Sequence, residues 1–463
     1  MTERNRAGRR FASVLAAAIV LAAAAASGCG RFSGARPSVL LVVVDTLRAD
    51  ALSCSGAARE VTPRLDAFFR DEATLYENAY AASSWTLPSF GTILTGAPPS
   101  THGADRLGAA FGSLRKGIPT LAESLHARKY LTMAIVNNPF LSREFGLDRG
   151  FARYDHEATT NASGRRADEV TRKALAFAYS VGDRPFFLLA HYFDPHLDYD
   201  PPEAFRKRFL PPGTPSDWAF SVADQVAFKT GRRSPSPEEA ARIRALYDAE
   251  VAFVDEQIGL LLDGFRRAGL DRHLTVIVTS DHGEEFFEHG GFEHGHSLHE
   301  EVARVPLLVR VPGRTKPGVR VAAPVSHADL APAILSIVDG GAGPGRDLSR
   351  PETLASEADL LLEGALYGDD RAALVRGRTK WIEPPGALYD LAADPRESRD
   401  LAAAPGGERE KDARDLAAAL ALAREKARLA GEALGPRAEA DLAPPTLRSL
   451  GIPYLEDPRR NRK

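Results

Sequence analysis

The stretch SVLLVVVD, residues 38–45, decides the fold expected for this chain. It is a continuous apolar run, rich in β-branched residues, that ends in an aspartate. A run with no polar alternation is typical of a strand buried on both faces of a sheet. Two further runs have the same form, RPFFLLAHYFDPH at 184–196 and HLTVIVTSDHGEE at 273–285. We therefore expect three buried strands, each of which delivers polar residues at its end.

Helical patterns lie between these strands. TRKALAFAYS at 171–180 precedes the second strand, and the long segment 237–269, which begins PEEAARIRALYD, precedes the third. The longer segment has apolar residues at helical spacing. Strands that alternate with helices predict an α/β fold, in which helices cover both faces of a mostly parallel sheet.

The residues at the strand ends are candidates for a binding site. Asp45 ends the first strand, His196 ends the second, and Asp281 and His282 end the third, followed by Gly283. Ligands of such sheets bind beyond the carboxyl ends of the strands. A single Asp in this place is often only a turn or cap residue. Three strands that share the feature favour a site, and the Asp-His pair on a tight turn is a plausible ligand pair for a divalent ion.

The segment SSWTLPSFGTILTG, residues 83–96, predicts a short helix with Pro88 in its first turn, where a missing N–H does no harm. Thr86 then lies at the helix N-terminus. One interpretation is that Thr86 is a helix cap, since Thr is common there. The other is that it is a nucleophile, held where backbone N–H groups favour an anion.

A histidine-rich segment at 290–309 reads as a loop, because Gly290, Gly291 and Gly295 interrupt it. It can be a solvated polar loop, or it can supply functional groups. Its histidines, together with the one just before it, are His289, His294, His296 and His299.

The first 29 residues predict a targeting segment. A basic start precedes an apolar run that ends in small residues before Cys29, as in a bacterial lipoprotein signal. We expect cleavage and lipidation at Cys29, a tether at 30–36, and a membrane-anchored location outside the cytoplasm, on the periplasmic side or at the outer membrane. An uncleaved anchor or plain secretion are the alternatives. Only Cys54 would then remain, which excludes a disulfide within the chain.

The composition restricts the class of protein further. The 463 residues include 59 Lys and Arg against 62 Asp and Glu, so we expect no nucleic-acid partner. No other stretch is long and apolar enough to span a bilayer.

Taken in order, these segments resemble the sulfatases, a family of the alkaline-phosphatase superfamily. The resemblance runs from about residue 37 to 401 and rests on VVVDTLRADALSCSG, SSWTLPSFGTILTG, HYFDPH, TSDHGEEF, RVPLLV and ALYDLAADPRESRDLA. It implies an alkaline-phosphatase-like fold with a catalytic domain at 37–340 and a smaller C-terminal subdomain at 341–403. That subdomain would contain a short antiparallel sheet. Residues 404–463 would form a C-terminal helix and tail, the helix either packing on the domain or binding a partner.

The resemblance also implies roles for single residues. Asp45, Asp281 and His282 would bind one divalent metal ion, and Thr86 would be the nucleophile and touch the same ion. His196 and His294 would contact the ester or assist the leaving group. We interpret His102 as structural. His191, His289, His296 and His299 stay ambiguous, and they do not assemble into a convincing second metal site.

The chain departs from the family pattern at the nucleophile. The usual motif is Cys or Ser-x-Pro-x-Arg, whose first residue is oxidised to formylglycine, but here Thr86 and Phe90 stand at its two ends. Threonine is not a substrate for that oxidation. A covalent ester on threonine must be hydrolysed at its central atom, which favours phosphorus over sulfur.

Three other positions differ as well. Thr46 replaces a second Asp, residues 136–139 lack two anion-binding groups, and the usual Asp-Asn is Asp281-His282. A histidine ligand favours zinc or manganese, with calcium still possible.

Three functions stay open. The first is an extracytoplasmic phosphate- or phosphonate-ester hydrolase or phosphotransferase that uses Thr86. The second is a sulfatase without formylglycine, and the third is an inactive binding protein on this fold. The substrate would be a small-molecule, glycan or lipid ester. The sequence does not determine the oligomeric state.

Overall fold

The computed structural model describes residues 36–156, 165–215, 217–340, 346–403 and 409–440. The described residues from 37 onward belong to one compact unit. The signal segment, lipidation at Cys29 and nearly all of the tether lie outside the described residues and stay predictions. Among the described residues, no helix combines the length and the apolar character that crossing a bilayer requires.

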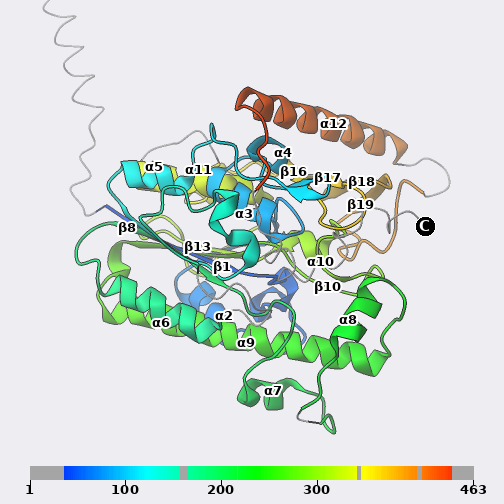
Figure 1. The fold of residues 1–463 in the computed structure, drawn as a ribbon, viewed down its shortest axis with the longest axis horizontal. Helices are drawn as coiled ribbons and strands as arrows, with labels where there is room; N and C mark the ends of the chain where they lie inside the picture. Colours follow the sequence, from blue (N-terminus) through cyan, green and yellow to red (C-terminus); the bar gives the residue numbers. More distant parts are fainter. Residues whose placement is uncertain (1–35, 157–164, 216, 341–345, 404–408, 441–463) are drawn as a thin grey trace, which may run out of the picture. The chain divides into compact units, whose positions relative to one another are not determined.

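An eight-stranded sheet forms the centre of the fold (Figure 1). Its strands, in spatial order, are β14 (Arg320–Val321), β2 (Thr74–Tyr76), β13 (Leu307–Arg310), β9 (Leu274–Ser280), β1 (Ser38–Val44), β8 (Phe186–Tyr192), β6 (Leu131–Ile135) and β7 (Arg153–Asp155). Strand β1 pairs in parallel with β8 and β9, and β13 is antiparallel to β9 and β2. The mostly parallel sheet and its three predicted strands are confirmed, and those strands are neighbours at its middle.

Helices cover both faces of this sheet, as predicted (Figure 1). One face carries α3 (Thr86–Thr95), α5 (Leu121–Ala127) and α11 (Leu330–Asp339); the other carries α2 (Pro63–Asp71), α6 (Ala167–Ala178) and α9 (Pro237–Arg267). Alternate residues of β1 enter different cores: Leu40, Val42 and Val44 pack on the α9 side, and Val39, Leu41 and Val43 on the α3 side. The unbroken apolar run therefore reflects burial on both faces.

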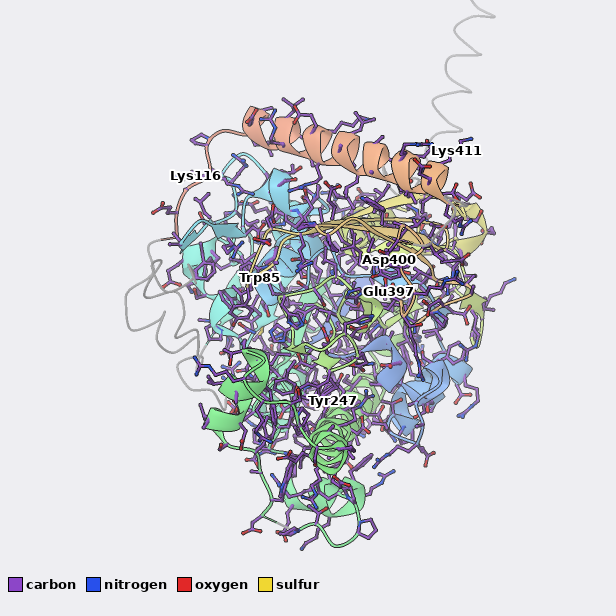
Figure 2. All side chains as sticks on the ribbon, turned by 90° about the vertical axis from the view of Figure 1, so that its right-hand side faces the viewer. Trp85, Lys116, Tyr247, Glu397, Asp400 and Lys411 are labelled. Atoms are coloured by element: carbon purple, nitrogen blue, oxygen red, sulfur yellow. The ribbon has the colours of Figure 1, made fainter. Side chains whose placement is uncertain are left out.

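The long helix α9 begins where the sequence provides a strong start. Ser236 and Glu239 form a capping box, and Pro237 occupies the first turn. Farther along, the buried Tyr247 reaches the segment after β1, where its hydroxyl donates to the Thr46 carbonyl and accepts from the Arg48 N–H, both at 2.9 Å. Figure 2 shows Tyr247 inside the molecule. This helix thus braces the chain that leaves the first strand.

The C-terminal part contains a four-stranded antiparallel sheet of β16 (Asp359–Glu363), β17 (Ala372–Arg376), β18 (Thr379–Glu383) and β19 (Ala387–Asp390). Helix α12 (Glu410–Ala433) packs on it through Leu416 and Leu420, against Leu374 and Leu388. The antiparallel sheet and the packing helix agree with the prediction.

Shorter elements complete the described chain. A second, three-stranded sheet consists of β12 (Arg304–Val305), β3 (Ala79–Tyr80) and β15 (Val325–Ser326). One hairpin pairs β10 (Glu285–Phe286) with β11 (Phe292–Glu293), and another pairs β4 (Arg106–Leu107) with β5 (Ala110–Phe111). Four short helices are α4 (Pro99–His102), α7 (Glu203–Phe209), α8 (Val222–Lys229) and α10 (Glu300–Ala303).

Candidate active site

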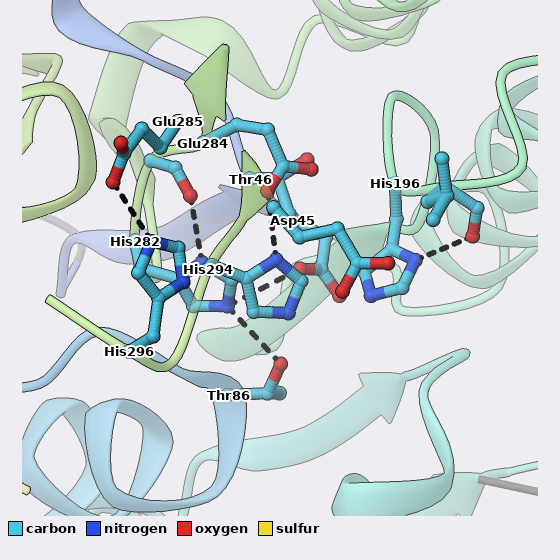
Figure 3. A network of polar contacts seen from close by, with 12 residues as sticks. Asp45, Thr46, Thr86, His196, His282, Glu284, Glu285, His294 and His296 are labelled. Carbon is cyan, nitrogen blue, oxygen red and sulfur yellow. Dashed lines mark hydrogen bonds and ion pairs between the residues drawn. The ribbon is translucent and has the colours of Figure 1, made fainter. Parts of the chain in front are cut away.

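The fold brings together the four residues proposed as metal ligands, of which Figure 3 labels Asp45, Thr86 and His282. Asp45 follows β1, Asp281 and His282 follow β9, and Thr86 is the first residue of α3. Nε2 of His282 lies 3.6 Å from Asp45 Oδ1 and 3.4 Å from Asp281 Oδ2. The same nitrogen lies 3.3 Å from Thr86 Oγ1, although the two residues are 196 positions apart. These four side chains converge from three separate parts of the chain.

Several buried polar atoms at this point have no hydrogen-bond partner among the described residues. They are Asp45 Oδ1, Thr46 Oγ1, Asp281 Oδ2 and both ring nitrogens of His191. Unpaired buried polar atoms are rare, and each costs on the order of 1–3 kcal/mol. Asp45, His191 and Asp281 each place a ligand atom within 4.8 Å of the others. A bound cation would satisfy one ligand atom of each of these three residues.

The separations between donor atoms suit such a cation. In a tetrahedral zinc site with bonds of about 2.0–2.1 Å, neighbouring ligand atoms lie roughly 3.3–3.4 Å apart. The three distances measured from His282 Nε2, 3.3, 3.4 and 3.6 Å, are close to that spacing. These three separations are therefore compatible with a shared divalent ion.

The residues around His282 hold its imidazole in the tautomer and charge state of a metal ligand. Its Nδ1–H donates to the Gly283 carbonyl at 3.0 Å, so Nε2 carries the lone pair that faces the carboxylates. Burial lowers the pKa of His282 to about 4, which keeps the imidazole neutral near pH 7. Gly283 is required at the turn, because a Cβ there would lie 2.1 Å from the Glu301 carbonyl oxygen.

The two carboxylates differ electrostatically. Burial raises the pKa of Asp281, and the charge of Asp45 raises it further. Burial also opposes ionisation of Asp45, but His196, His191 and His282 outweigh it and hold the pKa of Asp45 low. A cation between the two carboxylates would favour ionisation of both, which is the state that metal ligands need.

Thr86 is not the helix cap. The N-cap of α3 is Trp85, and no side-chain cap bond is made there. The Thr86 hydroxyl instead faces the centre, where Asn138 Nδ2 donates to it at 3.2 Å and to Asp45 Oδ2 at 2.8 Å. The side-chain oxygen Oδ1 of Asn138 accepts from the Phe140 N–H at 2.9 Å, which fixes the orientation of the side-chain amide. The first turn of α3 would favour negative charge at Thr86 Oγ1.

His196 and His294 lie beside this cluster. The ring of His294 is 4.4 Å from that of His282 and 5.1 Å from that of His196, measured between centroids. Nδ1 of His294 donates to Glu284 Oε1 at 2.9 Å, and Nδ1 of His196 donates to the Leu197 carbonyl at 2.7 Å. A neutral imidazole that donates through Nδ1 has its lone pair on Nε2. Burial and the neighbouring imidazoles lower the pKa of His294 well below its usual value.

The chain is similar to known proteins in sequence and in fold. A sequence model described as Sulfatase matches residues 37–340. The chain belongs to the sulfatase family. Iduronate 2-sulfatase of Mus musculus is 25% identical over 336 residues, which cover 60% of this chain and 60% of that protein. An arylsulfatase of Clostridium perfringens is 23% identical over 437 residues, which cover 79% of this chain and 90% of that protein.

A solved structure supports the same fold. The phosphonate monoester hydrolase of Agrobacterium radiobacter matches with a TM-score of 0.67 and 22% identity, over 85% of this chain and 96% of that one. The chain spans about 60% of the length of the iduronate 2-sulfatases that it matches. Members of the family bind a divalent metal ion, and the Asp/His/Asp cluster is the candidate site for it here.

Three residues of this centre were missed or undervalued in the sequence. Asn138 lies in the segment interpreted only as a loss of anion-binding groups, and its role depends on the fold. The sequence alone assigns no role to His191, although a polar residue inside the apolar run of a buried strand is a usable signal. Thr46 was noted only as a missing Asp, whereas its φ of 56° is rare for a β-branched residue and marks a strained turn.

The other histidines have different surroundings. His102 contacts Thr92 Oγ1 and the Pro88 carbonyl at 3.2 and 3.1 Å, behind α3, in keeping with a structural role. Three histidines of the loop after β10 each pair with a carboxylate: His289 with Glu301, His296 with Glu285 and His299 with Glu397. These pairs fasten the loop that carries His294.

Proposed function

We propose that this protein is a metal-dependent hydrolase of phosphate or phosphonate esters that uses Thr86 as its nucleophile. One observation carries the proposal: the Thr86 hydroxyl lies at the N-terminus of α3, 3.3 Å from His282 Nε2 and 3.2 Å from Asn138 Nδ2. A threonine that served only as a cap would bond to backbone N–H groups of its own helix. This hydroxyl faces the proposed cation ligands instead.

The chemistry of threonine supports phosphorus as the central atom. A formylglycine hydrate can release sulfate by breaking a C–O bond, and threonine offers no such route. Its ester must be cleaved by attack of water at the central atom, a reaction that metal-assisted phosphoryl transfer performs. The fold similarity to a phosphonate monoester hydrolase is compatible with this choice.

The ligand set of Asp45, Thr86, Asp281 and His282 suits zinc or manganese better than calcium. Calcium prefers six to eight oxygen ligands, whereas zinc accepts imidazole nitrogen and carboxylate oxygen in sites of four or five ligands. When bound, the ion would lower the pKa of the Thr86 hydroxyl and polarise an ester oxygen.

The chain's own residues would carry the protons. Thr86 Oγ1 attacks phosphorus and its proton passes to Nε2 of His294 or His196, while the bond from phosphorus to the leaving oxygen breaks. The protonated imidazole then donates that proton to the leaving oxygen. In the second half, water attacks phosphorus, the bond to Thr86 Oγ1 breaks, and the imidazole carries the water's proton back to Thr86. An acceptor alcohol in place of water would make the reaction a phosphotransfer.

The segment between β8 and α9 would influence substrate choice. Lys229 of α8 pairs with Glu293, the residue before His294, and its Nζ lies 3.0 Å from the Tyr367 hydroxyl. Related structures in this family bind sulfated sugars and other glycans. We therefore include glycan esters, with small-molecule and lipid esters, among the candidate substrates.

Turnover of aryl esters by Thr86 variants tests the proposal. Thr86→Ala should lose at least about a thousandfold in kcat toward aryl phosphonates and phosphate esters, because the attacking atom is absent. Thr86→Ser should retain measurable activity. Thr95→Ala is a matched control in the same helix, since its hydroxyl bonds backbone groups only, the Gly91 carbonyl and the Ala97 N–H.

Two results would contradict the proposal. Unchanged ester hydrolysis in Thr86→Ala would show that Thr86 is not the nucleophile. Turnover of aryl sulfate orders of magnitude faster than that of the phosphorus esters would instead indicate a sulfatase that works without formylglycine, as the names of the sequence relatives allow.

A further inference from the structure

His191 is the most unusual polar side chain of the central sheet. It lies on β8 beside Val43 of β1, and it is 0% exposed. Neither of its ring nitrogens has a hydrogen-bond partner among the described residues. A neutral imidazole has one N–H donor and one lone pair, and burying both unmatched is unfavourable. The site therefore lacks something that His191 requires.

Other buried histidines of the described chain do not share this feature. His102 and His327 are also almost fully buried, but each has bonded ring nitrogens. His327 Nε2, for example, donates to the Ser280 carbonyl at 2.8 Å. Histidine can be buried in this protein when the fold provides partners, so burial alone does not explain His191.

The surroundings of His191 indicate where a binding partner of its imidazole would lie. Its Nε2 lies 3.4 Å from Asp45 Oδ2, and a ligand atom of Asp281 lies within 4.8 Å. On the other side, the ring meets Phe90 edge to face, with centroids 5.2 Å apart. Phe90 offers no polar atom, and the polar side of the imidazole described by these contacts faces Asp45 and Asp281.

The adjacent orphan atoms indicate a cation rather than a water molecule. Asp45 Oδ1 and Asp281 Oδ2 are unpaired acceptors at the same point, and His282 Nε2 presents a lone pair to them. A single water can donate only two hydrogen bonds, fewer than these acceptors and a His191 lone pair would need. A divalent cation accepts electron pairs from all of them at once.

We propose that His191 is a direct ligand of the divalent ion, together with Asp45, Thr86, Asp281 and His282. This inference rests on the metal centre of the proposed function, and it adds a second imidazole that the sequence resemblance does not assign. Two nitrogen donors with carboxylate oxygens favour zinc, manganese or a similar transition metal and disfavour calcium. His191 thereby sets which metal the protein selects.

Metal binding to the full-length protein tests this without reference to turnover. Chelator-treated wild type is titrated with Zn²⁺ against a chromophoric competitor, and the Co²⁺ form is examined by absorption spectroscopy. His191→Leu and His191→Gln should each lower Zn²⁺ affinity at least about a hundredfold. Loss of a residue that only hydrogen-bonds a metal ligand typically costs about 10–100-fold. Both variants should also alter the Co²⁺ d–d bands. His102→Gln, which also removes a buried imidazole, should leave both measurements unchanged. X-ray absorption of the Zn²⁺-loaded wild type should count two imidazole ligands, a readout that needs no variant to fold.

The outcomes separate this inference from the proposed function. Superposable Co²⁺ spectra of wild type and His191 variants, or a single imidazole in X-ray absorption, would overturn it and leave His191 as a neighbour of Asp45. Two imidazoles in a protein whose Thr86→Ala variant still hydrolyses esters would support it while the proposed function fails. A wild type that binds no divalent ion would refute both.

Discussion

Lys380 offers a sharp test of how the C-terminal sheet is joined to the rest of the protein. It lies on β18, its side chain is 0% exposed, and its Nζ lies 3.1 Å from Glu300 Oε1 and 3.0 Å from Glu397 Oε1. Glu397 also accepts from the Glu300 N–H at 2.6 Å and from His299 Nδ1 at 3.1 Å. Figure 2 places Glu397 within the body of the molecule. The perturbation is Lys380→Met, which keeps the shape and removes the charge.

The expected loss of stability follows from the two carboxylates with which Lys380 forms ion pairs. At an effective dielectric constant of about 20, one ion pair at 4 Å contributes about 4 kcal/mol before desolvation. Breaking a buried pair by removing one partner typically costs about 3–5 kcal/mol, because the other charge stays buried. We expect Lys380→Met to lower the free energy of unfolding by that amount at pH 7. The loss should shrink toward pH 5, where a carboxylate left without its cation takes up a proton.

Urea unfolding followed by circular dichroism measures this change. The double variant with Glu300→Gln should recover part of the stability, since it removes one of the two buried carboxylates that lost the lysine. Lys426→Met, at an exposed position on α12, is the control and should change stability by less than about 0.5 kcal/mol. The reasoning is refuted if Lys380→Met costs less than about 1 kcal/mol, or if the double variant is as unstable as the single one.

Two further predictions concern the loop that carries His294. Glu284 holds His294 Nδ1, so Glu284→Gln should slow turnover about 10–100-fold, and more for esters with poor leaving groups than for nitrophenyl esters; an equal loss for all leaving groups would contradict the positioning role. The hydrogen bond with Glu301 raises the pKa of His289 to about 9. This pair should therefore stabilise the fold below about pH 6.5 and lose that contribution as the pH rises through 9. Because the ring is only half buried, the contribution should be on the order of 1 kcal/mol. His289→Gln should then be less stable than wild type at pH 7 and equal to it at pH 10; a constant difference at both pH values would contradict this.

Much of the fold could be predicted from local patterns. The strands β1, β8 and β9 could be predicted without knowledge of their neighbouring strands, because burial on both faces requires apolar residues at every position. The start of helix α9 could be predicted from Ser236, Pro237 and Glu239, because these capping residues lie within one helical turn of each other. Asp45, Asp281 and His282 could be proposed as ligands because the carboxyl ends of parallel strands meet at one edge of the sheet.

What the sequence could not reveal depends on contacts between distant residues. Thr86 could be a cap or a nucleophile until its hydroxyl was found beside His282, 196 positions away. His191 and Asn138 entered the centre only once β8 and the segment after β6 were placed next to β1. The sequence by itself determined the strands, the helices and the edge of the sheet where chemistry would occur, since these follow from periodicity along the chain. The tertiary structure alone decided which polar atoms are left unpaired at that edge, because hydrogen-bond partners are assigned in space.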